Sequence, residues 1–316
     1  MKLVFAALGR FACLLPTVVS AGAIIVATPA AFAMEGGQSP YLRGYRDFSS
    51  GILPPPGVQV RYDLNFYNGH ETSRIPQGQL ATSLRTVSNI LGIVGVTPAQ
   101  LWGANYGFAI RGAMTGVSAD RTVTNGARRV AASDAMTGLN DVVISPIVLG
   151  WHLGNWHWNV SASLWIPAGD YQATQRINTG KNYWSWSPQF AVTYLDRKAG
   201  LEFSAAFAYV ANYENTTTQY HSGDVAHVDF AAMQSIAPRL SIGAVGYVMS
   251  QVTDDVGAGA TLGSRRAQVF GAGPAIRYVI RTGKTPMILS AKYYREFSAR
   301  NTTEGDQGAL SLRANF

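Results

Sequence analysis

The chain has 316 residues, of which 14% are charged and 47% are hydrophobic, and its formal net charge is +7. A charged fraction so far below the usual quarter, combined with many aromatic residues, argues against intrinsic disorder and against an ordinary cytosolic enzyme. The single cysteine, Cys13, lies in an N-terminal apolar stretch, so a disulfide framework or a thiolate metal cluster is excluded. Basic residues cluster no further than pairs, and no nucleic-acid partner is predicted.

Residues 1–33 have the pattern of a secretory signal peptide. Two basic residues accompany an apolar stretch at 11–27, and the small-x-small triplet Ala31-Phe32-Ala33 follows it. The alternative is an uncleaved anchor, because residues 11–33 carry no charge and are long enough to span a membrane. Two prolines would interrupt such a helix. The sequence therefore predicts cleavage after residue 33 and a mature chain that begins at Met34.

The stretch 142–169 lacks charge for long enough to suggest a membrane helix, but its polar residues contradict that reading. With a period of two, apolar Trp156, Trp158 and Val160 share one face, whereas His157 and Asn159 share the other. This alternation is typical of a strand with one apolar and one hydrated side.

The same alternation recurs in twelve segments of the chain. Most are longer than the five or six residues common in soluble strands, and long enough for a tilted membrane-spanning strand of about nine to eleven. The predicted strands are 57–67, 82–96, 103–117, 139–152, 155–167, 182–195, 199–211, 223–235, 238–251, 265–281, 285–297 and 307–316. Short turns alternate with long polar connections, which are predicted as loops at 68–81, 118–138, 168–181, 212–222, 252–264 and 298–306.

Long loops at one rim and tight turns at the other are the pattern of an outer-membrane barrel. Lipid offers no water to the backbone amides, so a sheet there must close on itself. The fold class predicted for 57–316 is all-β: a transmembrane antiparallel up-and-down β-barrel of twelve strands in the bacterial outer membrane. We expect a monomer surrounded by outer-membrane lipid. The last strand alternates and ends at Phe316, as strands presented to the barrel-assembly machinery do.

Four strings of residues resemble a known family in order and approximate spacing. They are Thr137-Gly138-Leu139-Asn140-Asp141-Val142, Trp165-Ile166-Pro167-Ala168-Gly169-Asp170-Tyr171, Asn178-Thr179-Gly180-Lys181-Asn182-Tyr183-Trp184, and Gly243-Ala244-Val245-Gly246-Tyr247 with Gln251-Val252-Thr253-Asp254-Asp255. They resemble the outer-membrane channel family labelled "meta-pathway of phenol degradation", over nearly the whole mature chain. Asn140 and Ala168 depart from the residues usual in that family, without consequence for chemistry.

The resemblance implies a twelve-stranded barrel of Gram-negative bacteria that passes small, often bulky or aromatic molecules without energy input. The family label reflects an association with aromatic-degradation pathways rather than an enzyme activity.

No enzyme signature is found in the sequence, and no catalytic residue, cofactor or metal site is predicted. His227 and Asp229 share a face, so a relay to a serine nucleophile is conceivable, but a polar network in the lumen is the favoured reading. Asp254-Asp255 could contribute to a Ca²⁺ site, although an exposed loop pair is favoured.

The hydrated faces of the predicted strands give a candidate pore lining. Taking the apolar faces outward, the inward side chains are Arg61, Asp63, Arg111, Glu202, His227, Asp229, Lys292, Glu296 and Arg313. Four basic and four acidic groups, with one histidine, would pair with one another in a confined lumen. This lining favours weakly charged or polarisable solutes and predicts at most a weak preference for anions.

Residues 34–56 follow no period and are rich in proline, which cannot join a central ladder. One hypothesis is that this arm folds into the barrel and narrows its periplasmic mouth, with Arg43, Arg46 and Asp47 touching lumen charges. The alternative is a flexible periplasmic leader.

The function predicted from the sequence is passive diffusion or uptake of small, bulky or aromatic hydrophobic molecules. One alternative is a transporter that releases hydrophobic compounds sideways into the bilayer. Pro146, Pro188 and Pro274 lie within predicted strands, where each removes a ladder bond. A structural barrel without transport is the other alternative.

Overall fold

The structure is a computed structural model, and it describes residues 33–37, 39–75, 78–261, 265–282 and 285–316. Apart from Ala33, the predicted leader lies outside the described residues. No helix in the described part of the chain is long and apolar enough to cross a membrane.

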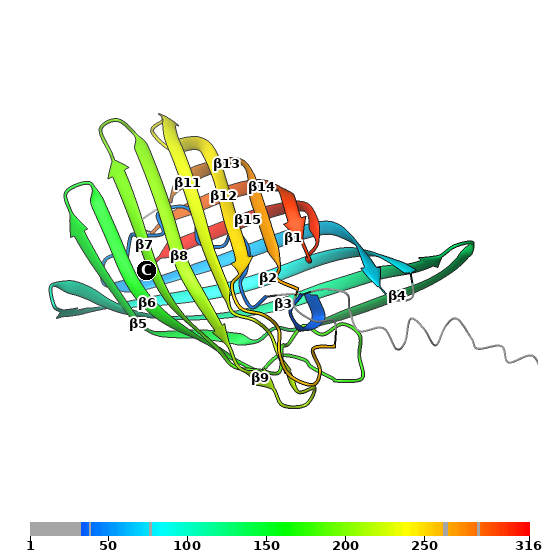
Figure 1. Cartoon of the computed structure of the whole chain (residues 1–316). Coiled ribbons are helices and arrows are strands. Elements are labelled where there is room, and N and C mark those ends of the chain that lie inside the picture. The colour runs from blue at the N-terminus through cyan, green and yellow to red at the C-terminus, as the bar shows by residue number, and fades with distance from the viewer. Residues whose placement is uncertain (1–32, 38, 76–77, 262–264, 283–284) are drawn as a thin grey trace, which may run out of the picture.

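The described chain is almost entirely β-structure (Figure 1). A single 3-10 turn, η1 (Glu35–Gly37), precedes the strands. The strands are β1 (Gly57–Ile75), β2 (Gly78–Leu101), β3 (Ala104–Asn125), β4 (Arg128–Leu139), β5 (Val142–Leu153), β6 (Trp156–Ile166), β7 (Ser185–Asp196), β8 (Leu201–Asn212), β9 (Glu214–Asn215), β10 (Tyr220–His221), β11 (Val225–Ala237), β12 (Leu240–Gln251), β13 (Gln268–Thr282), β14 (Thr285–Arg300) and β15 (Glu304–Asn315).

The main sheet closes into a barrel. Its thirteen strands pair antiparallel with their neighbours, and β1 closes the ring by pairing with both β2 and β15. Strands β4 and β5 both pair with β3, one after the other along its length, so they are successive halves of one barrel strand. The thirteen strands of the sheet therefore form a barrel of twelve. The predicted twelve-stranded up-and-down barrel is confirmed. The remaining strands, β9 and β10, form a small hairpin in one connection.

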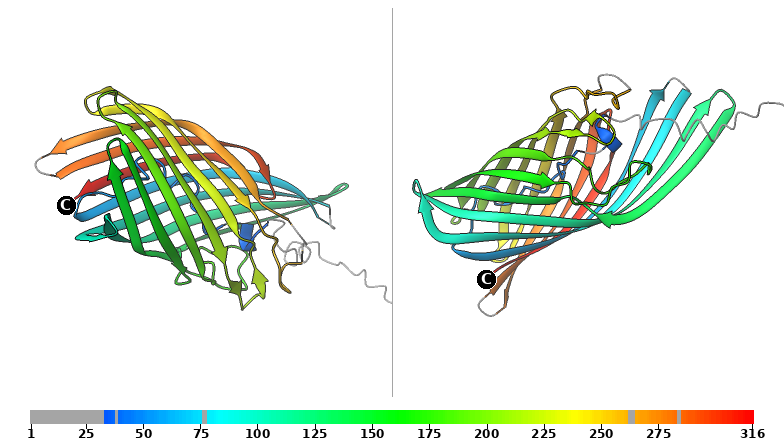
Figure 2. Two further views of the ribbon diagram at one scale, coloured as in Figure 1. Left: turned by 60° about the vertical axis from the view of Figure 1, so that its left-hand side comes forward. Right: turned by 90° about the horizontal axis from the view of Figure 1, so that it is seen from below.

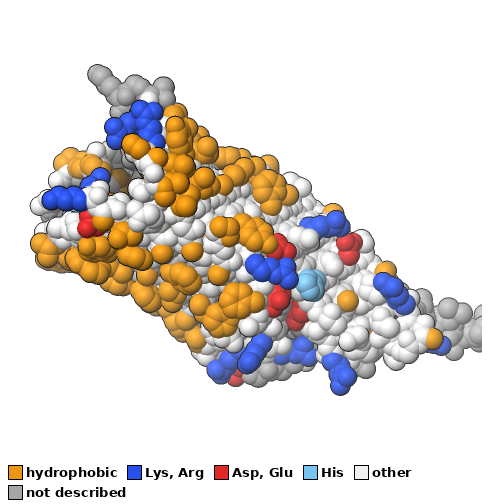
Figure 3. All heavy atoms as spheres, turned by 90° about the horizontal axis from the view of Figure 1, so that it is seen from above, with side chains coloured by type: hydrophobic (Ala, Val, Ile, Leu, Met, Phe, Trp, Pro, Cys, Tyr) orange, Lys and Arg blue, Asp and Glu red, His pale blue; other side chains and the backbone are white. Residues whose placement is uncertain are grey.

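The outer surface of the barrel body is apolar (Figure 3). The outward side chains of the strands are large and exposed, among them Leu91, Phe108, Phe190, Phe207, Leu289 and Leu310. Outward ion pairs lie beyond this surface, at Arg85–Asp120 and Arg295–Asp306. An apolar band between polar zones is the outer surface that lipid requires, and it agrees with the bacterial outer membrane as the protein's location.

The loops predicted at 68–81 and 118–138 are wrong. These residues continue the strands, so that β1 and β2 form one long hairpin and β3 and β4 another, and both extend far beyond the barrel body (Figures 1 and 2). Above the lipid the outward positions become polar, which removes the apolar–polar alternation by which the other strands were recognised. We call this extension the projecting sheet; it comprises 71–75, 78–86, 117–125 and 128–137.

The long loop predicted at 298–306 is also wrong, because β14 and β15 are joined by residues 301–303 alone. The other connections agree with the predicted asymmetry. Tight turns join β2 to β3, β5 to β6, β7 to β8, and β11 to β12, at the rim where β1 begins and β15 ends. Longer connections join β6 to β7, β8 to β11, and β12 to β13 at the opposite rim. In outer-membrane barrels the short turns face the periplasm and the long loops face outward. The projecting sheet is therefore extracellular.

Candidate functional site

The arm, residues 34–56, crosses the whole lumen. At the extracellular rim, the backbone nitrogen of Met34 donates to Asp255, which follows β12, at 2.8 Å. At the periplasmic rim, the arm leads into Gly57, the first residue of β1. Between these ends the arm is held by the inward side chains of at least six strands.

The first central contact involves Tyr41. Its hydroxyl donates to Asp229 of β11 at 2.7 Å, and its ring stacks on His227 with the centroids 3.6 Å apart. The Nδ1 of His227 lies 3.2 Å from the same carboxylate. His227 and Asp229 thus share a tyrosine of the arm as their partner.

Arg43 binds the opposite wall. Its guanidinium pairs with Glu296 of β14 at 2.5 Å and donates to Thr302 at 2.7 Å. The same fully buried carboxylate accepts from the hydroxyls of Tyr67 and Tyr247 at 2.8 and 2.6 Å. Burying this anion is compensated by one cation and several donors, which is the arrangement that makes such burial tolerable.

A buried ion pair fastens the middle of the arm. Asp47 pairs with Lys292 of β14, and the exposed fractions of the two side chains are 1% and 3%. The ammonium of Lys292 also donates to the carbonyl of Gly44 at 2.9 Å. Gly44 has a φ of 68°, and a Cβ there would lie 2.7 Å from the Tyr294 ring, so glycine is required at this close approach.

Two further contacts hold the arm near its periplasmic end. Arg46 donates to Gln189 of β7 and, at 3.1 Å, to Asn159 of β6. The backbone nitrogen of Ser49 donates at 2.6 Å to Glu202 of β8, whose carboxylate pairs with Arg277 of β13 at 2.6 Å.

Tyr45 lies between two arginines. The guanidinium carbons of Arg61 and Arg111 are 4.2 and 4.4 Å from the centre of its ring, both within the range of cation–π attraction. Arg61 also pairs with Asp63 at 2.7 Å and donates to the carbonyl of Tyr45 at 3.1 Å. Arg313 lines the same cavity of the lumen as Tyr45, Arg61 and Arg111.

The nine residues proposed as lining thus lie inside the barrel, but most contact the arm or a partner of the arm. Sequence reasoning missed Arg277, although its exposed neighbours Ile276 and Tyr278 mark it as inward. It also missed Tyr41 and Tyr45, which lie in a segment without a period. Among the described residues there is no group of three or more His, Cys, Asp or Glu side chains that could hold a metal ion.

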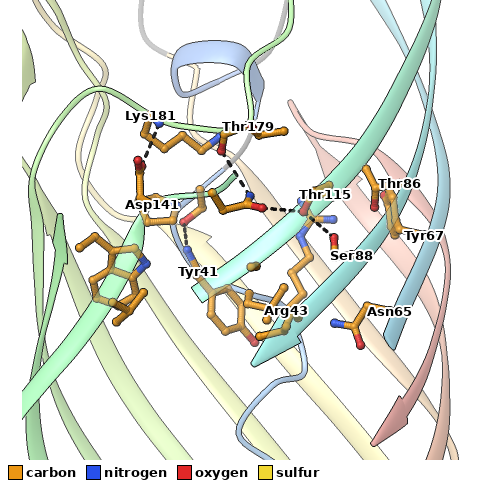
Figure 4. A pocket seen from close by; sticks show the side chains of 18 of the residues that line it. Tyr41, Arg43, Asn65, Tyr67, Thr86, Ser88, Thr115, Asp141, Thr179 and Lys181 are labelled. Carbon is orange, nitrogen blue, oxygen red and sulfur yellow. Dashed lines mark hydrogen bonds between the residues drawn. The ribbon is translucent and has the colours of Figure 1, made fainter. Parts of the chain in front are cut away.

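The arm divides the lumen into two cavities of about 200 Å³ each. The outer cavity opens toward the projecting sheet and mixes apolar and polar walls (Figure 4). The inner cavity lies beside residues 45–54 of the arm. The residues that line both cavities are Tyr41, Leu42, Arg111, Val143 and Trp165.

Three of the four strings that carry the family resemblance meet beside the outer cavity. The ladder breaks between β4 and β5, and the β6–β7 connection fills this break. Asp170 accepts from the nitrogen of Leu139 at 2.8 Å, and Asp141 accepts from the nitrogen of Lys181 at 2.8 Å. A Cβ on Gly169 would lie 2.7 Å from the Cα of Gly180, so the connection folds tightly on itself.

Lys181 is the cationic group that this connection presents to the outer cavity. Burial lowers its pKa to about 8, and the carboxylates of Asp141 and Glu35 oppose that shift. It lines the outer cavity together with Asp141 (Figure 4).

The projecting sheet continues the outer cavity as an apolar surface. Leu84 lines the cavity itself. Val117 lies on the same face at the level of Thr86, and a cluster of Ile75, Leu80 and Val123 lies farther out. We call this series of side chains the apolar stripe; it leads from the tip of the sheet toward the lumen and is interrupted by Thr82 and by the Arg121–Asp134 ion pair.

The barrel wall is irregular at the three prolines named above. The β7–β8 pairing runs to Trp186–Ala211 and resumes only at Gln189–Ala208, leaving Pro188 unpaired on that side. The β5 ladder shifts across Pro146, and the β13–β14 pairing skips Pro274. An open groove of about 790 Å³ lies beside Pro188 on the outer surface of the barrel, lined mainly by outward residues such as Phe190 and Phe207.

Comparison with known proteins gives a family and a fold. The profile of a family described as "Putative MetA-pathway of phenol degradation" matches residues 63–312. No curated protein matches the sequence. A solved COG4313 outer membrane channel from Pseudomonas putida F1 is similar at a TM-score of 0.62 and 13% identity, covering 85% of this chain and 98% of that one. A Pseudomonas aeruginosa FadL homologue covers 92% and 98% at 8% identity, but its TM-score is only 0.39.

Proposed function

Because the chain belongs to the outer-membrane family described as "Putative MetA-pathway of phenol degradation", we propose that it is a channel for the passive uptake of small hydrophobic molecules, including bulky or aromatic ones. We expect it to act as a monomer, without catalysis and without a cofactor. Its folding would depend on the barrel-assembly machinery, which would bind the strand that ends at Phe316.

The observation that carries this proposal is the apolar stripe. Hydrophobic solutes gain free energy in proportion to the apolar area that they remove from water. A solute that reaches the sheet meets apolar side chains at Val123 and Leu80 and again at Leu84 and the outer cavity, and between them it passes the Arg121–Asp134 ion pair. There, Trp165 and Val143 offer contact area, while Arg111 and Lys181 suit a weakly charged end of the molecule.

The test compares two monovalent anions of similar size in a liposome-swelling assay. Benzoate presents an aromatic ring, whereas gluconate presents hydroxyl groups. We expect benzoate to enter proteoliposomes faster. Leu84→Asp should remove this preference, because a carboxylate would interrupt the stripe at the cavity. Ser83→Asp is the matched control on the exposed outer face of the same strand. Equal rates for the two anions in the unchanged protein would refute the aromatic preference.

A second route of release is supported by the irregular wall. The missing β7–β8 pairs at Pro188 and the groove beside it favour exit of a solute sideways into the bilayer. The register places Ser187 opposite Val210, so a disulfide between Cys substitutions there would close the gap. Cross-linking should stop delivery of a fluorescent apolar solute to lipid, and reduction should restore it. If delivery to lipid continues after complete cross-linking, the gap at Pro188 is not the exit, and only the axial route through the lumen remains.

A further inference from the structure

Asp255 is a buried carboxylate at the extracellular rim, with only 8% of its surface exposed. It accepts four hydrogen bonds: from the nitrogens of Met34 and Gly223 at 2.8 Å, the hydroxyl of Tyr220 at 2.8 Å, and Nε2 of Gln251 at 2.7 Å. All four donors are neutral as long as Met34 is joined to Ala33. Within the described part of the chain, no lysine, arginine or histidine lies within 4 Å of this carboxylate.

Most other buried carboxylates inside the barrel have a basic partner. Glu296, Glu202 and Asp47, which are buried to a similar degree, each pair with a lysine or an arginine. A buried anion without a cation is costly, so a cation is expected where Met34 approaches Asp255.

The neighbouring residue holds Met34 in place. Glu35 is bound by two extracellular connections: its carboxylate accepts from Asn215 at 2.9 Å and Thr218 at 2.7 Å of the β8–β11 connection, and from Tyr171 of the β6–β7 connection at 3.3 Å. Its own nitrogen donates to Ser222 at 3.0 Å. The side chain of Met34 is itself 1% exposed and belongs to the apolar cluster inside the barrel. The position of its nitrogen is therefore fixed independently of Asp255.

Cleavage before Met34 would also relieve a backbone constraint at this residue. Met34 has a φ of 62°, in the left-handed region that side chains other than glycine rarely adopt. This constraint exists only while Ala33 is attached. In addition, residue 33 lies at the extracellular rim, so a leader still joined to it would have to be carried through the barrel to the far side of the membrane.

We propose that Asp255 binds the α-ammonium group of Met34, which is released when the leader is cut after Ala33. Hydrolysis by a signal peptidase adds one water molecule, leaving a carboxylate on Ala33 and, after protonation, an ammonium on Met34. The new cation meets the carboxylate that the loops already hold. Removal of the leader thereby fastens the extracellular end of the arm, and a chain cut elsewhere lacks this fastening.

The experiment measures how fast an amine-reactive reagent modifies Met34 in the folded protein at pH 7.5, with the modified peptide quantified by mass spectrometry. An opposite charge within about 4–6 Å stabilises the ammonium, so we expect labelling at least about tenfold slower than in Asp255→Asn. Asp254→Asn is the matched control, because the neighbouring Asp254 pairs with Arg266 instead; its labelling rate should equal that of the unchanged protein.

A second variant keeps Asp255 and moves the amine. Two chains are refolded for comparison: one begins at Met34, and the other carries Gly-Ser before Met34. They differ in the position of the N-terminal ammonium group. The extended chain should be labelled as fast as an unstructured peptide, and its single-channel recordings should show more frequent openings. Labelling of the unchanged protein at the rate of Asp255→Asn would overturn the proposal. So would an intact mass showing that the mature chain does not begin at Met34.

Discussion

The lumen of the barrel body and the projecting sheet share one inward face but carry opposite chemistry. In the body, inward positions hold charges such as Lys292 and Glu296, and each meets a partner on the arm. On the projecting sheet, the inward positions include Val117 and Val123, which pack among apolar neighbours. The inward face is thus charged where a chain segment is held, whereas on the projecting sheet apolar side chains flank the Arg121–Asp134 ion pair.

This difference changes how the charged lining is interpreted. A set of inward charges suggests contact with a charged solute, but here the buried charges are paired, either with the arm, as Glu296 and Lys292 are, or with each other, as Arg61 and Asp63 are. Their main effect is to hold a segment that lacks secondary structure of its own. We therefore expect selectivity to depend on the space that the arm leaves and on the apolar stripe above it.

The largest effect on the difference between the two regions is expected from removing the arm. Deletion of 36–53 should raise the single-channel conductance in planar bilayers several-fold, because twelve strands enclose more space than their own side chains fill. The ladder from β1 to β15 does not include these residues, so the barrel should still form and keep its β-sheet circular dichroism. An unchanged conductance would mean that the arm does not obstruct the passage.

The next largest effect is expected at the buried pair of Asp47 and Lys292. Lys292→Met leaves the Asp47 carboxylate buried without its cation, which costs about 3–5 kcal/mol. We expect the arm to detach often, seen as frequent large openings and faster proteolysis within 36–53. Asp47→Asn combined with Lys292→Met removes both charges and should restore most of the closed time. Equal opening frequencies in the single and double variants would contradict this explanation.

The sequence predicts the barrel because lipid imposes one rule on every spanning strand. Outward residues must be apolar, so the period of two is visible in segments such as 155–167. That rule ends at the membrane surface. Beyond it, Arg85 and Asp120 point outward, and the strand continues with a polar exterior that resembles a loop in composition.

The candidate site was only partly predictable for a different reason. Inward charges could be read from the alternation, but their partners could not, since the arm has no period and its contacts join residues far apart in the chain. Arg43 and Glu296, for example, are separated by most of the sequence. The meeting of Gly138, Asp170 and Thr179 likewise depends on how a long connection folds back into a break in the ladder.

A smaller effect is expected at Arg111, where the two cavities meet. The structure gives Arg111 no ion pair among the described residues, and its guanidinium only stacks on Tyr45, whereas Arg61 is paired with Asp63. Arg111→Ala should therefore lower the preference for anions, measured as a reversal potential in a salt gradient. Arg61→Ala should instead destabilise Asp63 and disturb the arm. Identical shifts in selectivity for the two variants would show that pairing does not distinguish them.

The smallest effect concerns pH and Lys181, at the junction of the body and the projecting sheet. Because burial lowers its pKa to about 8, Lys181 loses its charge between pH 7 and 9, and the anion preference of the outer cavity should fall slightly over that interval. The unfolded chain binds more protons between pH 8 and 10.5, so the stability of the β6–β7 connection should rise with pH there. Lys181→Met should abolish both changes, whereas Lys198→Met, in an exposed turn at the opposite rim, should leave them intact. A pH response that survives in Lys181→Met would have to come from another group.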